Sequence, residues 1–185
     1  MRAARVLAAV VLLAVGLGAG ALAALASTKA PANLGADGIG AARFGLPKAQ
    51  AVDELSALFG APTWRGVNHG CGPQWTEVAW DDLAAEFRQD RFSGYRYASA
   101  RQLRGGLGSP PAPVKPSFPK LATVRGITLE STLAALRAAY RLHLAGAGRW
   151  HSDNGLIFVS NAQHSPAPLS SRIIEVKTSG ACGDF

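Results

Sequence analysis

One short pattern occurs twice in this chain, 81 residues apart, and this duplication restricts the fold more than any other feature of the sequence. Each copy begins with a glycine and an aliphatic residue, and three large apolar residues follow at the spacing of one helix face. The copies are Gly45-Leu46, Val52, Leu55 and Phe59, and Gly126-Ile127, Leu133, Leu136 and Tyr140. A unit of this size buries little apolar surface by itself, so we expect the two copies to pack together.

Each copy predicts an amphipathic helix. In the first copy, Pro47 suits the first helical turn, and Gly60 and Pro62 end the helix. In the second copy, Thr128 is a suitable cap and Glu130 lies in the first turn. The predicted apolar stripes comprise Val52, Leu55, Leu58 and Phe59 in the first copy, and Leu129, Leu133, Leu136 and Tyr140 in the second.

Alternating residues after each helix predict three strands per copy. The first set covers residues 74–80 and 83–88, joined by a two-residue turn at Asp81-Asp82, and then residues 92–97. The second set covers residues 149–152, 155–161 and 172–178, where either Asp153-Asn154 or Asn154-Gly155 forms the turn. A short extended piece at residues 39–44 or 121–125 is compatible with the start of each copy.

We therefore predict an α+β fold of two tandem modules, each a helix followed by a small antiparallel sheet of about three strands. The first module is assigned to residues 35–99 and the second to residues 120–185. Residues 27–34 are predicted to be a tether, and residues 100–119 a basic connector too rich in Pro and Gly for a helix or a central strand.

The first 26 residues are predicted to direct export. Arg2 and Arg5 precede an apolar run that ends at Ala26, with small residues that suit a signal-peptidase cut before Ser27. The alternative is an uncleaved anchor, because 21 apolar residues are enough to span a bilayer. Both readings predict a secreted or extracytoplasmic protein, which contacts a membrane only through residues 1–26 if these are not cleaved.

Export would place the two cysteines, Cys71 and Cys182, in an oxidising compartment. An even number of cysteines in an oxidising compartment predicts one disulfide, here between the first module and the far end of the second. The alternative is a reactive Cys71 thiol assisted by His69, although no known cysteine-hydrolase motif surrounds it.

Basic residues are concentrated between Arg88 and Arg125, where eight Lys and Arg residues face one acid, Asp90, for a net charge of +7. Such a segment attracts an anionic partner, such as an acidic protein surface or an envelope component. The alternative is a solvated, self-repelling connector. Because no nucleic-acid-reading motif accompanies the charge, we predict no nucleic-acid partner.

Several longer stretches resemble exported proteins of actinobacteria that look like tandem copies of the module in beta-lactamase inhibitory protein and in the small outer-membrane-assembly lipoprotein. These stretches are "GADGIGAARFGLPKAQAVDELSALFGAP", "AWDDLAAEF", "RGITLESTLAALRAAY" and "IIEVKTSGACGD". The resemblance implies that each module is a helical segment packed on a small antiparallel sheet. It further implies that tandem copies can form one continuous sheet whose open face binds another protein, and that the protein is not an enzyme. The inhibitory protein has a disulfide inside each module, whereas this chain has one cysteine per module, so its inhibitor activity is not carried over.

The hairpin register places Glu77 opposite Glu86, and like charges at opposed positions destabilise a strand pair. The two carboxylates either share a proton or a cation for acid–base chemistry, or are neutralised by Arg88 or Arg96. The four histidines are scattered without metal-ligand spacing, so we predict no metal and no cofactor.

The sequence therefore predicts non-catalytic binding of a protein or an anionic envelope component through a sheet face. Aromatic anchors and basic side chains are the candidate contacts. They are Trp75, Arg88, Tyr95, Arg96, Tyr97, Arg101 and Arg104. Two alternatives stay open: a small exported hydrolase that uses Glu77/Glu86 or Cys71/His69, and a purely structural envelope protein tethered by its N-terminus.

Overall fold

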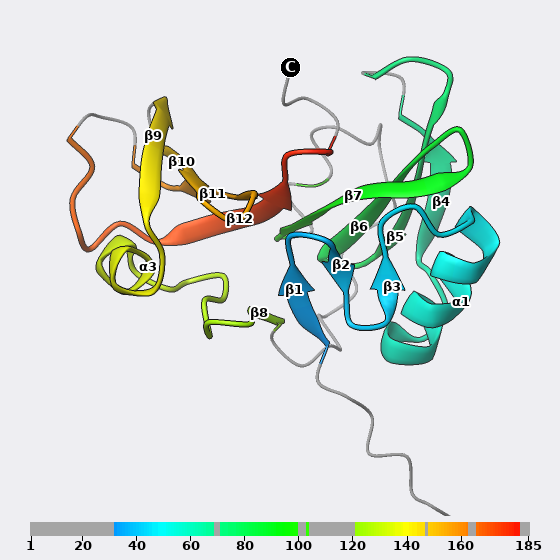
Figure 1. The fold of residues 1–185 in the computed structure, drawn as a ribbon, viewed down its shortest axis with the longest axis horizontal. Coiled ribbons are helices and arrows are strands. Elements are labelled where there is room, and N and C mark those ends of the chain that lie inside the picture. Colours follow the sequence, from blue (N-terminus) through cyan, green and yellow to red (C-terminus); the bar gives the residue numbers. More distant parts are fainter. Residues whose placement is uncertain are drawn as a thin grey trace, which may run out of the picture.

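The computed structural model describes residues 32–68, 71–99, 103, 121–146, 148–162 and 166–181. Within these residues the protein is mostly β, with two sheets and two helices (Figure 1). Eight strands form one continuous sheet, and four short strands form a second.

The larger sheet extends from one end of the molecule to the other, in the order β4-β5-β6-β7-β12-β11-β10-β9. All its neighbouring strands are antiparallel. Helix α1 precedes four strands that follow one another in the sheet, and α3 precedes the other four. The bounds are α1 Lys48–Phe59, β4 Trp64–Val67, β5 Trp75–Trp80, β6 Leu83–Arg88, β7 Arg91–Ala98, α3 Leu133–Ala139, β9 Leu142–Gly146, β10 Arg149–Ser152, β11 Leu156–Ser160 and β12 Ile173–Thr178.

The predicted fold class is wrong, because the chain does not form two helix-plus-small-sheet modules. The strands of both halves join where β7 pairs with β12, with Tyr97 opposite Val176. This pairing removes the two free edges that separate small sheets would expose, and unpaired edges carry unsatisfied backbone groups.

The second sheet has the order β3-β2-β1-β8 and also joins the two halves. Its strands are β1 Asn33–Gly35, β2 Gly38–Ile39, β3 Ala42–Arg43 and β8 Ala122–Thr123, and β1 pairs in parallel with β8. Strand β1 lies partly within the segment predicted to be a tether, and its Leu34 is fully buried.

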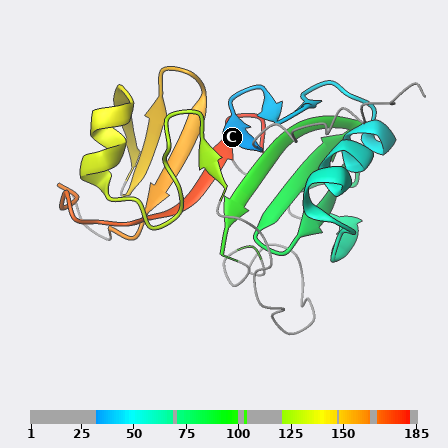
Figure 2. The same cartoon turned by 90° about the horizontal axis from the view of Figure 1, so that it is seen from below.

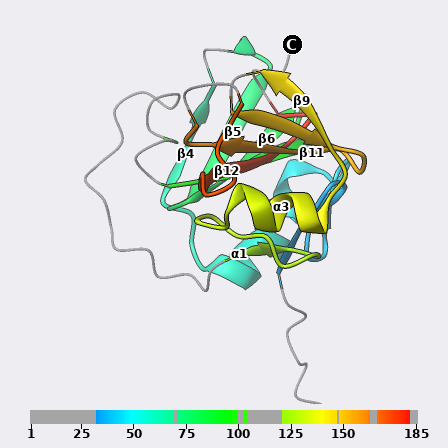
Figure 3. The same ribbon diagram turned by 90° about the vertical axis from the view of Figure 1, so that its left-hand side faces the viewer.

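Both helices cover the same side of the larger sheet, one at each end (Figures 2 and 3). Their apolar stripes form the core together with the helix-facing side of the sheet, as the repeated pattern predicted. The buried stripe residues are Val52, Leu55, Phe59, Leu133, Leu136 and Tyr140.

The two helices begin differently from the prediction. Pro47 occupies the N-cap of α1, and Gly60 ends this helix with a φ of 84°, a left-handed value that glycine adopts without strain. Helix α3 begins only at Leu133, where the Thr132 side chain accepts a hydrogen bond from the backbone N–H of Ala135. The expected cap at Thr128 is wrong because Glu130 has a φ of 73°, which is incompatible with a helical turn.

The first hairpin has the predicted register, with Glu77 opposite Glu86 and a turn at Asp81-Asp82. The second has neither of the two-residue turns considered. Trp150 lies opposite Phe158 and His151 opposite Ile157, and a three-residue loop at residues 153–155 follows Ser152. The Ser152 hydroxyl closes this loop by accepting from the backbone N–H of Leu156.

No helix in the described part of the chain is long and apolar enough to cross a membrane. The segment predicted to be a signal peptide or an anchor, residues 1–26, lies outside the described residues.

Candidate functional site

The opposed carboxylates Glu77 and Glu86 lie on the side of the sheet that faces away from the helices, and both are buried. Asn68 Nδ2 donates to Glu77 Oε2 at 3.0 Å, while Glu77 Oε1 has no hydrogen-bond partner among the described residues. Burial raises the pKa of Glu77 from 4.5 to about 7, against the opposing effects of the Arg96 charge and the Asn68 hydrogen bond. Because neither carboxylate is accessible, the pair is in no position to contact a substrate.

Arg96 is the cation that neutralises this region. Its Nε lies 2.8 Å from Glu175 Oε1, and the two side chains are 19% and 13% exposed. Arg96 is a cross-strand neighbour of Lys177, so a row of charged groups crosses β7 and β12 on this side of the sheet. Of the two arginines expected to offset the carboxylates, Arg96 is ion-paired with Glu175 and lowers the pKa of Glu77 through its charge, whereas Arg88 lies over the Trp75 ring, 5.8 Å from its centroid.

The predicted aromatic anchors are buried. Tyr95 and Tyr97 belong to the core on the helix side, and the Tyr95 hydroxyl donates to the Gly35 carbonyl at 3.0 Å. Trp75 is only 4% exposed. All three side chains therefore present little surface to a partner, while the predicted contacts Arg101 and Arg104 lie outside the described residues.

Among the described residues there is no free cysteine, and Cys71 is disulfide-bonded. A bonded Cys71 has no thiol to act as a nucleophile, which counts against the Cys71/His69 hydrolase. Cys182 and His69 lie outside the described residues, so the pairing of Cys71 with Cys182 stays a prediction.

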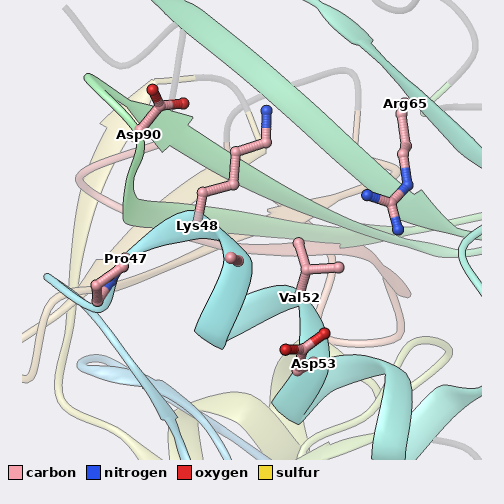
Figure 4. Close-up of a pocket in the computed structure, with 7 residues that line it drawn as sticks. Pro47, Lys48, Val52, Asp53, Arg65 and Asp90 are labelled. Atoms are coloured by element: carbon pink, nitrogen blue, oxygen red, sulfur yellow. The ribbon is translucent and has the colours of Figure 1, made fainter.

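A groove opens where α1 leaves the edge of the sheet uncovered (Figure 4). It has a volume of about 560 Å³ and is open to solvent. Its floor and walls combine apolar and charged side chains, and Arg65 extends from β4 toward α1. The lining residues are Pro47, Lys48, Ala49, Val52, Asp53, Arg65 and Asp90.

The charged side chains of the groove are not all engaged. Lys48 Nζ donates to Thr76 Oγ1 at 2.8 Å and lies 5.6 Å from the centroid of the Phe87 ring. Arg65 and Asp53 have no ion pair or side-chain hydrogen bond with any described residue, and both are exposed. The groove therefore offers an unoccupied cation and an unoccupied carboxylate above an apolar floor.

A smaller pocket of about 280 Å³ lies in the other half, beside Arg125, Tyr140 and Asp153. Its carboxylate is already engaged, because His143 Nε2 lies 2.6 Å from Asp153 Oδ1 and Arg141 approaches the other oxygen. This pocket is the weaker candidate.

The sequence did not predict the groove because β4 was not predicted. The run Trp64-Arg65-Gly66-Val67 alternates in size but contains a glycine, which weakens a strand signal. The glycine has a packing reason: a Cβ on Gly66 would lie 2.3 Å from Cζ2 of the Trp64 ring. Trp64 can cover this end of the sheet only because residue 66 has no side chain.

No protein-family model, curated protein or solved structure matches this chain.

Proposed function

We propose that this protein is an exported, non-catalytic binding protein that accepts a segment of another protein in the groove between α1 and β4. The observation that supports it is an open, partly apolar groove whose Arg65 and Asp53 side chains have no partner among the described residues. The resemblance to tandem-module inhibitory proteins, itself a proposal, points to protein binding as well.

Catalysis is disfavoured by the chemistry of the described groups. The groove lining contains no serine, cysteine or histidine, so it lacks the hydroxyl or thiol nucleophile and the imidazole base of a Ser–His or Cys–His hydrolase site. Glu77, whose pKa burial raises to about 7, is fully buried on the opposite side of the sheet.

A protein segment suits the groove better than a small molecule or an anionic polymer. Small-molecule sites enclose most of the ligand surface, whereas this groove is open. Its two cations, Lys48 and Arg65, are balanced by Asp53 and Asp90, so a uniformly anionic chain gains no net attraction there.

Selection from a library of linear peptides, followed by affinity measurement, tests this proposal. Ala49 lines the groove, so Ala49→Arg fills it, while Gln50→Arg adds the same side chain to an exposed position on α1 that does not line it. We expect the selected peptides to lose affinity for Ala49→Arg and keep it for Gln50→Arg. Peptides that bind both variants equally, or a library that yields no ligand, would refute the proposal.

A further inference from the structure

We infer that the segment bound in the groove adds to the larger sheet as a further strand, paired with the outer edge of β4. This inference rests on the proposed function. Strand β4 ends the sheet order, and its residues pair on one side only, with β5. An edge of this kind presents backbone donors and acceptors to an extended peptide.

The hydrogen-bond pattern identifies the outward-facing groups. The backbone N–H of Asn68 donates to the carbonyl of Trp75, so this pair is a hydrogen-bonded one. In an antiparallel ladder such pairs alternate, which makes Gly66 opposite Glu77 the next hydrogen-bonded pair. The N–H and C=O groups of Arg65 and Val67 therefore point away from β5, and no described residue bonds to them.

The side chains of the same two residues select the occupant. Arg65 and Val67 lie on the helix-facing side of β4, and both are exposed, Val67 by 39%. Residues of an added strand that lie opposite them are two positions apart and share this side of the sheet. A carboxylate opposite Arg65 and an apolar residue opposite Val67 complement the edge, so the predicted occupant is an extended segment with an acidic and an apolar residue separated by one position.

The other end of the sheet is less suitable for strand addition. The pairing of β9 with β10 slips between Arg149 and Trp150, so only the first part of β9 has regular geometry. A bulge on an edge strand disrupts pairing with a further strand. The register of β4 with β5 contains no such shift.

A scan of single backbone N-methyl groups along the tightest-binding library peptide tests the inference. Strand addition predicts that affinity falls about fivefold at alternate positions only, because every second N–H faces β4 and one hydrogen bond contributes about 1 kcal/mol. On the protein side, Val67→Pro removes an outward N–H without removing a bond to β5, and Val67→Ala is its control because it shortens the side chain but keeps that N–H. We expect Val67→Pro to bind about fivefold more weakly than Val67→Ala.

The charge preference has its own test. Peptides selected on the Arg65→Glu protein should carry a basic residue at the position where peptides selected on the wild type carry an acidic one. Peptides that lose affinity for Ala49→Arg but tolerate N-methylation without alternation would overturn strand addition and leave the binding function standing. Peptides indifferent to Ala49→Arg would overturn the function itself. The N-methyl scan decides the matter even if Val67→Pro fails to fold.

Discussion

Replacing the buried carboxylate Glu77 by its amide should stabilise the protein at neutral and alkaline pH. Glu77 is fully buried, directly opposite Glu86, and its pKa is raised from 4.5 to about 7. Between pH 4.5 and about 7, the folded state therefore keeps a proton on Glu77 that the unfolded state has lost. The stabilisation from this proton is present in full below pH 4.5 and is lost as the pH rises through about 7.

The size of the effect follows from the shift. Each pKa unit corresponds to about 1.4 kcal/mol, so the free energy of unfolding should fall by about 3 kcal/mol across this window. Glu77→Gln keeps a neutral side chain at every pH, so it should equal the wild type near pH 4.5 and exceed it by about 3 kcal/mol at pH 8. For a protein of this length, the difference corresponds to about 6–12 °C in Tm.

Urea unfolding of both proteins from pH 4.5 to pH 8 measures the difference directly. Asp153→Asn is the control, because the Asp153 side chain is 48% exposed and its ion pairs should contribute below about 1 kcal/mol. A Glu77→Gln protein that is less stable than the wild type at pH 8 would show that Glu77 is ionised and favourably paired. That result would refute the argument from burial.

Three further predictions concern packing and charge. Gly66→Ala should lower the free energy of unfolding by about 1–3 kcal/mol in urea, because the new Cβ meets the Trp64 ring. This loss should largely vanish in a Trp64→Ala background, and an equal loss in both backgrounds would exclude the clash. Val176→Ala, fully buried where the two halves join, should cost about 2 kcal/mol, whereas Val124→Ala, 64% exposed, should change the stability by less than about 0.5 kcal/mol; similar values for both would mean that the junction is not a packed core. Arg96→Ala should lower the free energy of unfolding by about 3 kcal/mol, because Glu175 loses its ion-pair partner. Because Arg96 also lowers the pKa of Glu77, its loss should extend the pH-dependent fall in stability to higher pH, and an unchanged pH profile would contradict this role.

Local patterns predicted local structure well. The helix-face spacing placed Val52 and Leu133 in the core, and the Asp81-Asp82 turn set the register that opposes Glu77 and Glu86. These features depend on residues a few positions apart, whose geometry is set by the repeat of a helix or a strand. Boundaries were less accurate, as the late start of α3 shows, because a single residue such as Glu130 in the left-handed region ends a helical pattern.

The candidate site was not predictable in the same way. The sequence made Tyr95 and Tyr97 candidate contacts on one side of their strand, but an alternating strand does not reveal which of its sides is covered, and both belong to the core. The groove needs α1 to leave one edge of the sheet open, and it combines Lys48 and Asp53 of the helix with Arg65 of a strand that the sequence did not reveal. Only the packing of these elements brings the charges together.

By itself, the sequence determined the two amphipathic helices, the first hairpin and the pairing of like charges within it. Only the tertiary structure decided that the strands of both halves form one sheet, since β7 and β12 are far apart in the chain and any two exposed edges are compatible partners. It also decided which carboxylate is buried and which edge stays open. Pairing between strands that are far apart in the chain, and burial, depend on what lies opposite a residue in space, and the local sequence pattern does not identify that neighbour.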